Sequence, residues 1–126
     1  MKLLIVDDNI KYRHRLASVI SSIKGIEVVG QAGDVPEAID AVKRMKLDTI
    51  ILDIHMPGGS GLDVLRASKS ISPAPLVIML TVGPESEYRD TCFALGADYF
   101  FEKSNGIRAM MSLLIKMVHK SRTHRM

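Results

Sequence analysis

The sequence contains very little cysteine, and it lacks the features of a secreted or membrane protein. Its single cysteine, Cys92, cannot form a disulfide within the chain, and a lone thiol fits a reducing compartment. The N-terminus enters a five-residue apolar segment that is followed at once by two acids. That pattern is not a signal peptide, and it is too short to span a membrane. We therefore expect a cytoplasmic protein.

The sequence also lacks an internal repeat, a low-complexity segment and any cluster of Cys and His at zinc-ligand spacing. Its 126 residues, 47% of them apolar, suffice for one compact domain with its own core. The net charge of +3 is modest, and the basic excess gathers near the C-terminus, at Lys116, Lys120, Arg122 and Arg125. We expect one domain over residues 1–121, followed by a basic tail, 122–126, that is a solvated helix end.

Five short apolar runs alternate with five amphipathic segments. The predicted strands are 2–6, 26–29, 47–53, 76–80 and 98–102. The predicted helices follow caps at Asn9 and Asp34 or begin near Leu62, Pro84 and Gly106, and the predicted loops include 30–33 and 57–61. The first helix is expected to turn Leu16, Val19, Ile20 and Ile23 inward. Short crossovers of this kind predict an α/β fold with a parallel, doubly wound sheet. The flavodoxin-like order 2-1-3-4-5 and other doubly wound orders both fit the alternation, and 2-1-3-4-5 is the better guess for five strands in a chain of this length.

The run Ile50–Leu52 reads as a strand buried on both faces, and it ends in the carboxylate of Asp53, shortly before Pro57. In an open parallel sheet the functional crevice lies beyond the carboxyl ends of the strands. An acid at that position therefore predicts a functional site.

Other polar residues follow the neighbouring predicted strands: Asp7 and Asp8 after the first, Thr81 after the fourth and Lys103 after the fifth. The carboxyl ends of parallel strands lie at one edge of the sheet, so these residues should converge there. Three carboxylates within several ångströms of one another repel by on the order of 4 kcal/mol per close pair at an effective dielectric near 20. A cation relieves that repulsion, and a site with only oxygen ligands suits Mg²⁺. Together with one ammonium and one hydroxyl, such a site is built for phosphoryl transfer.

At these residues the chain resembles the receiver domain of bacterial two-component response regulators. The matching blocks are Leu3–Asn9, Leu52–Pro57 with Gly61, Thr81, and Gly96–Asp98 leading to Lys103. The resemblance covers essentially the whole chain, and its blocks stand in the right order at the right strand ends.

The resemblance implies that Asp53 is the nucleophile that accepts a phosphoryl group from a phosphohistidine of a sensor histidine kinase or phosphotransfer protein. Asp8 and Asp53 are then direct Mg²⁺ ligands together with the backbone carbonyl of His55, and Asp7 acts mainly through bound water. Such a protein is a signalling phosphoacceptor that catalyses only its own phosphorylation and dephosphorylation.

The resemblance also implies a switch. Lys103 pairs with the phosphoryl oxygens, and Thr81 moves to hydrogen-bond them, which leaves space for the switch aromatic, here Phe100. The surface formed by the fourth helix, fifth strand and fifth helix is then repacked for a downstream protein. Because the chain ends one helix after its fifth strand, we expect a stand-alone receiver that signals by protein contact.

The sequence departs from the family pattern in four places. Val82 is branched where most relatives carry a small residue, which predicts slow phosphorylation. His55 stands two residues after the phosphoacceptor and could alter the lifetime of the phosphoryl group, although a solvent-facing role fits as well. Phe100 lacks the hydroxyl of a tyrosine, and Ser104 replaces a proline, which argues against a cis peptide bond after Lys103.

Three other functions share part of this pattern. A flavin-binding domain would have the same fold, but no phosphate-binding loop rich in glycine and hydroxyl side chains follows the first strand. A phosphohydrolase would usually need a second acid where His55 stands. Nucleic-acid binding through the basic tail lacks a recognition motif, and we expect neither nucleic acid nor membrane as a partner.

Overall fold

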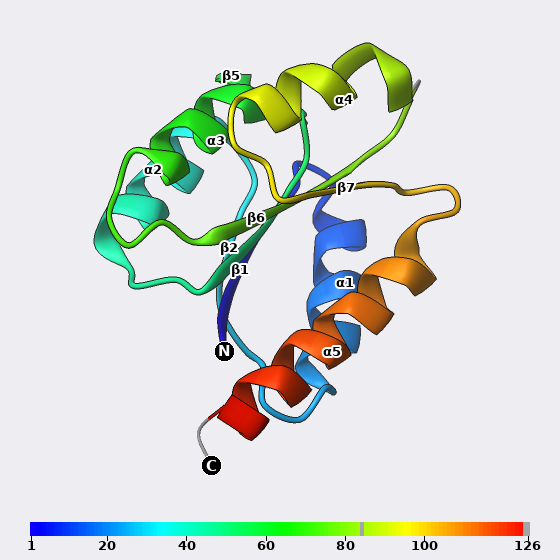
Figure 1. The fold of residues 1–126 in the computed structure, drawn as a ribbon. Coiled ribbons are helices and arrows are strands. Elements are labelled where there is room, and N and C mark those ends of the chain that lie inside the picture. The colour runs from blue at the N-terminus through cyan, green and yellow to red at the C-terminus, as the bar shows by residue number, and fades with distance from the viewer. Residues whose placement is uncertain (84, 125–126) are drawn as a thin grey trace.

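The computed structural model describes residues 1–83 and 85–124, and its centre is a parallel sheet (Figure 1). The five strands are β1 (Lys2–Val6), β2 (Glu27–Ala32), β3 (Thr49–Leu52), β6 (Leu76–Thr81) and β7 (Tyr99–Glu102). Their order across the sheet is β2-β1-β3-β6-β7, and every neighbouring pair is parallel. The predicted fold class and strand order are confirmed.

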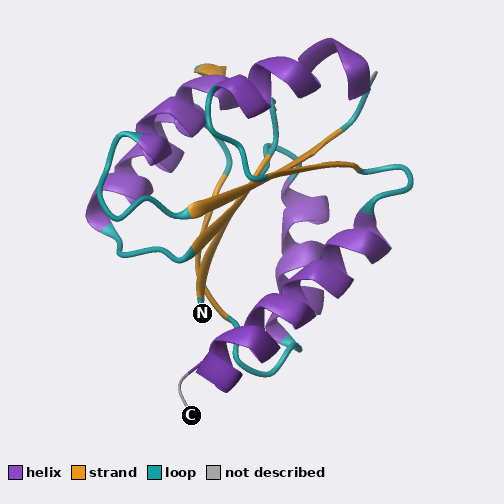
Figure 2. Cartoon of the chain, in the orientation of Figure 1, coloured by secondary structure: helices purple, strands orange, loops and turns teal. Residues whose placement is uncertain are grey.

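Helices cover both faces of this sheet (Figure 2). One face carries α1 (Ile10–Ser21) and α5 (Ile107–His124), and the other carries α2 (Val35–Arg44), α3 (Gly61–Lys69) and α4 (Glu85–Ala94). Side chains alternate between the two faces along β1: Leu3 and Ile5 belong to the core beneath α1 and α5, whereas Leu4 and Val6 belong to the other core. Burial on both faces explains why the three central strands, β1, β3 and β6, are mainly apolar runs.

Side-chain caps fix where three of the helices begin. The Asn9 side chain accepts a hydrogen bond from the backbone of Tyr12, and the Asp34 side chain accepts one from Glu37, as predicted for these two caps. Ser60 caps α3 and forms a capping box with Asp63. These caps set the loops at the carboxyl edge of the sheet, where the polar residues of interest lie.

The second strand is longer than predicted. Residues 30–33 were expected to form a loop, yet β2 continues to Ala32, and Gln31 and Ala32 pair with Ile5 and Val6. Gly30 is a close-packing position inside the strand, because a Cβ there would lie 3.3 Å from the side chains of Leu4 and Met45. A register irregularity opposite Leu3 and Leu4 accommodates it.

The inward position predicted for Val19 is wrong, because this side chain is 47% exposed. Leu16 and Ile20 lie one turn apart and already face the sheet, and Val19 is rotated by about 100° around the helix from Ile20. The side chain of Val19 lines a groove between α1 and α5 instead.

The predicted loop 57–61 contains structure. A two-stranded hairpin, β4 (His55–Met56) with β5 (Gly59–Ser60), follows β3, and α3 begins at once at Gly61. The third strand is correspondingly shorter than predicted, because the chain turns after Leu52 to form this hairpin.

At the C-terminus, α5 continues through residues 122–124 of the predicted tail, and Arg125 lies outside the described residues. Pro84, the predicted start of the fourth helix, also lies outside them. Within the described part, the one cis peptide bond is Ser72–Pro73, so the Lys103–Ser104 bond is trans. No helix in the described part is both long and apolar enough to cross a membrane.

Candidate functional site

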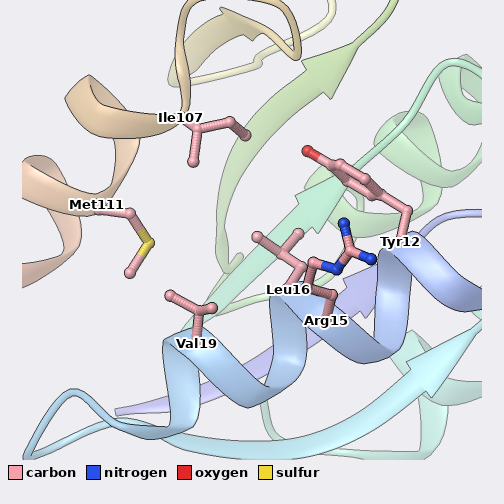
Figure 3. A pocket seen from close by; sticks show the side chains of 6 residues that line it. All are labelled: Tyr12, Arg15, Leu16, Val19, Ile107 and Met111. Carbon is pink, nitrogen blue, oxygen red and sulfur yellow. The ribbon is translucent and has the colours of Figure 1, made fainter.

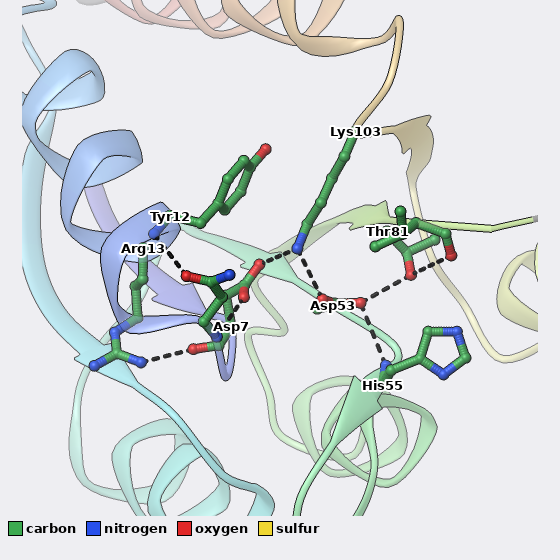
Figure 4. Close-up of polar contacts among 9 residues, drawn as sticks. Asp7, Tyr12, Arg13, Asp53, His55, Thr81 and Lys103 are labelled. Atoms are coloured by element: carbon green, nitrogen blue, oxygen red, sulfur yellow. Dashed lines mark hydrogen bonds and ion pairs between the residues drawn. The ribbon is translucent and has the colours of Figure 1, made fainter.

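Asp53 lies directly after β3, and its side chain is almost fully buried. The hydroxyl of Thr81 donates a hydrogen bond to Asp53 Oδ1 at 2.8 Å, and the backbone N–H of His55 donates to the same oxygen at 3.3 Å. The ammonium of Lys103 lies 3.0 Å from Asp53 Oδ2 (Figure 4). Both carboxylate oxygens therefore have donors, as a buried charge requires.

The paired acids after β1 meet Asp53 at this edge. Asp7 is 3% exposed; its Oδ1 accepts a hydrogen bond from the backbone of Asn9 at 2.9 Å, and its Oδ2 lies 2.5 Å from Lys103 Nζ. Asp8 is exposed at the rim. One carboxylate oxygen from each of Asp7, Asp8 and Asp53 falls within 4.8 Å of the others, so this oxygen-only donor set fits a hard divalent ion such as Mg²⁺.

Hydrogen bonds between strand ends bring these residues together. The backbone N–H of Asp53 donates to the carbonyl of Val6 at 3.0 Å, and that of Lys103 donates to the carbonyl of Thr81 at 2.9 Å. Parallel pairing thus continues one residue beyond the strands and aligns the polar residues that follow them. The structure brings together the five residues that were predicted to meet at this edge: Asp7, Asp8, Asp53, Thr81 and Lys103.

The site disfavours the charged form of Asp7 and favours the charged form of Lys103. Burial raises the pKa of the Asp7 carboxyl, and the hydrogen bonds from Lys103 and Asn9 reverse only part of that effect. Burial acts to lower the pKa of Lys103, but the hydrogen bonds and charges of Asp7 and Asp53 outweigh it and raise the pKa overall. Lys103 therefore stays an ammonium, while the two buried acids share one counter-charge.

Gly61 supports Asp53 from beneath. Its N–H donates to the carbonyl of Ile54 at 2.7 Å, and a Cβ at this position would collide with the backbone carbonyl of Asp53. Only glycine allows α3 to approach the Asp53 backbone this closely.

The residues proposed to modify the rate or the switch lie around this centre. His55 has an exposed side chain whose ring meets Tyr88 of α4 edge to face, with 5.6 Å between centroids. Val82 is 56% exposed at the rim, and Phe100 is 7% exposed in the core beneath α2, α3 and α4. Among the described residues, the hydrogen-bond donors to the Asp53 carboxylate are Thr81, Lys103 and the backbone of His55. The side chains of His55, Val82 and Phe100 do not contribute to it.

Sequence reasoning missed two residues that support the acids. Arg13 donates from Nη1 to the backbone carbonyl of Asp7 at 2.6 Å, and it reaches Gln31 of β2 with Nε. The ring of Tyr12 lies against Lys103, with 4.3 Å from its centroid to Nζ. Both residues stand about one helical turn after the paired acids. That spacing could have indicated that their side chains lie near the acids, because the first turn of a helix faces the loop before it.

Comparison with known proteins places the chain in one family. The family described as the response regulator receiver domain matches residues 3–115. A protein-glutamate methylesterase/protein-glutamine glutaminase of Methanospirillum hungatei is 34% identical over 122 residues, which are 95% of this chain and 36% of that protein. The nitrate/nitrite response regulator protein NarP of Escherichia coli is 33% identical over 113 residues, which are 90% of this chain and 53% of NarP. The chain thus spans about a third and about half of these two relatives.

Solved structures agree with this assignment. The response regulator domain of Thermotoga maritima CheB superposes with a TM-score of 0.82 at 27% identity, covering 95% of this chain and 94% of that one. A receiver domain protein of Methanospirillum hungatei has the same fold at 20% identity, with a TM-score of 0.79 and coverage of 98% and 97%. With the family match over residues 3–115, these findings mean that the chain belongs to the receiver domains of two-component response regulators.

Proposed function

We propose that Asp53 accepts a phosphoryl group from a phosphohistidine of a sensor histidine kinase or phosphotransfer protein. A carboxylate oxygen of Asp53 forms a bond to phosphorus while the bond from phosphorus to the imidazole nitrogen breaks, and the imidazole leaves with that electron pair. The observation that carries the proposal is the burial of Asp53 between the ammonium of Lys103 and the hydroxyl of Thr81, beside two further acids. Such an arrangement stabilises new negative charge on phosphoryl oxygens.

Asp8, Asp53 and the backbone carbonyl of His55 are the residues that would hold Mg²⁺, with Asp7 acting mainly through bound water. The ion, when bound, neutralises charge on the phosphoryl oxygens and on the acids. The three carboxylates fit this role because their oxygens converge within 4.8 Å and none is replaced by a nitrogen or sulfur ligand.

Lys103 and Thr81 would bind the product. The ammonium of Lys103 is free to leave Asp53 Oδ2 for a phosphoryl oxygen while it keeps its contact with Asp7. The Thr81 hydroxyl, which donates to Asp53 Oδ1, can donate to a second phosphoryl oxygen with a small rotation. Binding therefore needs no new polar groups, only a redistribution of donors already present.

We propose a switch in which Thr81 and Phe100 move together. In the unmodified chain Thr81 donates to Asp53 and Phe100 is buried nearby in the core. In the phosphorylated form the Thr81 hydroxyl would turn to a phosphoryl oxygen, and the Phe100 ring would move into the space that Thr81 leaves. Phosphorylation would then stabilise a state that the unmodified chain visits, in keeping with couplings of about 1 to 3 kcal/mol. The output surface of α4, β7 and α5, which exposes Phe93 and Tyr99, would meet the downstream protein.

This function is signalling rather than catalysis on a separate substrate. The esterase and glutaminase activities in the names of some relatives belong to proteins of which this chain spans between 23% and 36%. We propose that the chain catalyses only its own phosphorylation and dephosphorylation, because the acids and the lysine surround Asp53 itself.

The test is labelling by a small phosphodonor. The purified protein is incubated with Mg²⁺ and acetyl phosphate and analysed by intact mass. We expect a phosphoryl mass gain that is stable in acid, labile in base and absent from Asp53→Asn. Equal labelling of Asp53→Asn, or no labelling of the folded wild type, would contradict the proposal.

A further inference from the structure

The ammonium of Lys103 has neighbours on three sides, and one of them is not an acid. Two neighbours are the carboxylates of Asp7 and Asp53, at 2.5 and 3.0 Å. The third is the aromatic ring of Tyr12, whose centroid lies 4.3 Å from Nζ (Figure 4). A lysine ammonium carries three N–H donors, and it has three neighbours here: the two carboxylates and the ring face.

The position of Tyr12 follows from the loop that also supplies the acids. Tyr12 stands in the first turn of α1, and its backbone N–H donates to the capping side chain of Asn9 at 3.0 Å. The ring therefore belongs to the helical turn that directly follows Asp7 and Asp8. A residue of this turn can hold Lys103, which follows the last strand, at a fixed place relative to the acids.

The phenol hydroxyl does not explain this placement. Tyr12 Oη is buried and has no hydrogen-bond partner among the described residues. Figure 3 shows the hydroxyl end of Tyr12 directed toward Ile107, across the apolar groove between α1 and α5. Burial also raises the pKa of the phenol, so the ring stays neutral beside the acids. The favourable polar contact that remains for this side chain is the one between its ring and the ammonium.

We propose that Tyr12 is a positioning residue for Asp53: its ring holds the Lys103 ammonium in the place where the phosphoryl oxygens arrive. The lysine side chain is long and flexible, and fixing it beforehand removes an ordering cost from the transition state. The ring also keeps water from one side of the ammonium, which strengthens its attraction for the new charge. This inference rests on the proposed function of Asp53.

The test compares three side chains at position 12 in phosphorylation by acetyl phosphate with Mg²⁺. Tyr12→Phe keeps the ring and removes the orphan hydroxyl, whereas Tyr12→Leu keeps an apolar side chain and removes the ring. We expect Tyr12→Leu to be labelled about tenfold more slowly and Tyr12→Phe to restore most of the rate, since a partly desolvated cation–π contact is equivalent to roughly a tenfold change. Val19→Ala, which alters the same groove away from Lys103, is the matched control and should keep the wild-type rate.

A second readout observes the contact itself. In protein with ¹³C-labelled lysine, the ring current of Tyr12 should shift the Lys103 ε-methylene signals upfield in the wild type and in Tyr12→Phe, and the shift should vanish in Tyr12→Leu. Unshifted Lys103 signals in the wild type would overturn the inference even if Tyr12→Leu failed to fold.

The outcomes separate the two proposals. If the wild type is labelled on Asp53 and folded Tyr12→Leu is labelled at the same rate, Tyr12 only packs, and the inference falls while the proposed function stands. If Tyr12→Phe is as slow as Tyr12→Leu, the hydroxyl rather than the ring matters, and the inference is again wrong. If the folded wild type is not labelled at all, the proposed function itself fails.

Discussion

The ammonium of Lys103 lies 2.5 Å from the carboxylate of Asp7, across 96 positions of sequence, and both side chains are nearly buried. This ion pair joins the first strand end to the last and closes the site around Asp53. Its two members are perturbed in the same direction, because the pKa of Asp7 and the pKa of Lys103 are both raised. In the folded chain the ionised form of Asp7 is therefore disfavoured, whereas the ionised form of Lys103 is favoured. The pH dependence of the free energy of unfolding tests this difference.

The first prediction concerns Asp7 in the absence of metal. Burial raises its folded-state pKa above the ordinary 3.8, so the folded chain binds this proton more tightly than the unfolded chain. Its contribution to the free energy of unfolding is therefore fully present below pH 3.8 and is lost as the pH rises through the raised pKa. Asp7→Asn removes this loss. Urea unfolding across that pH range should find Asp7→Asn more stable than the wild type at neutral pH, with the difference shrinking toward pH 3.8; a constant difference would refute the assignment.

The second prediction concerns Mg²⁺. Three carboxylates and one ammonium leave excess negative charge, so Mg²⁺ should raise the free energy of unfolding, by about 2.7 kcal/mol at a hundredfold excess over its dissociation constant. EDTA should reverse the gain. Asp8→Ala should remove most of it, whereas Asp40→Asn, an exposed acid on α2, should keep it. Equal gains in both variants would place the ion elsewhere.

The third prediction concerns backbone contact beneath the site. Gly61→Ala would push a methyl group into the Asp53 carbonyl, and this overpacking should lower the free energy of unfolding by about 2 to 3 kcal/mol. Gly33→Ala is the matched control, because its methyl would meet only the movable end of the Arg13 side chain and should cost less than about 1 kcal/mol. Chemical denaturation of the two variants decides the point, and similar losses would disprove the close approach at Gly61.

How far the sequence predicted this site can be judged from single residues. Asp53, Thr81 and Lys103 were predictable because each follows an apolar run, and parallel strands bring their carboxyl ends together. Tyr12 was not, since helical spacing places it near the acids but does not say that its ring turns toward Lys103 rather than into the core. Side-chain orientation at an element's edge depends on contacts with distant segments, which periodicity does not contain.

The fold, like the site, was predictable where it depends on local sequence patterns and not where it depends on contacts between distant segments. The parallel, doubly wound sheet was predictable from the alternation of strands and helices, whereas its strand order was a guess that the structure confirms, and the end of β2 was not predicted. Gly30 falls in the predicted loop 30–33, but in the structure it allows close packing against Leu4 and Met45 inside the strand. Glycine has two uses, and only the neighbours in space decide between them.

The fourth prediction follows from how charge divides between the two helical layers (Figure 1). Residues 9–26 and 103–126, which contain α1 and α5, carry ten Lys and Arg and no acid. The rest of the chain carries seven Lys and Arg against fourteen acids, a net charge of −7. A face with exposed charge of one sign binds surfaces of the opposite charge nonspecifically. A cation exchanger should therefore retain the protein through the α1 and α5 face. Lys116→Glu should therefore shorten retention more than Lys43→Glu on α2, and equal shifts would contradict the polarity.

The central claim is that Asp53 itself receives the phosphoryl group, and reductive trapping tests it most directly. After reaction with acetyl phosphate and Mg²⁺, borohydride converts an aspartyl phosphate to homoserine, which tandem mass spectrometry locates in the sequence. The account predicts homoserine at position 53 and at neither Asp7 nor Asp8. Homoserine at one of those two positions, or at none in a folded protein, would contradict it.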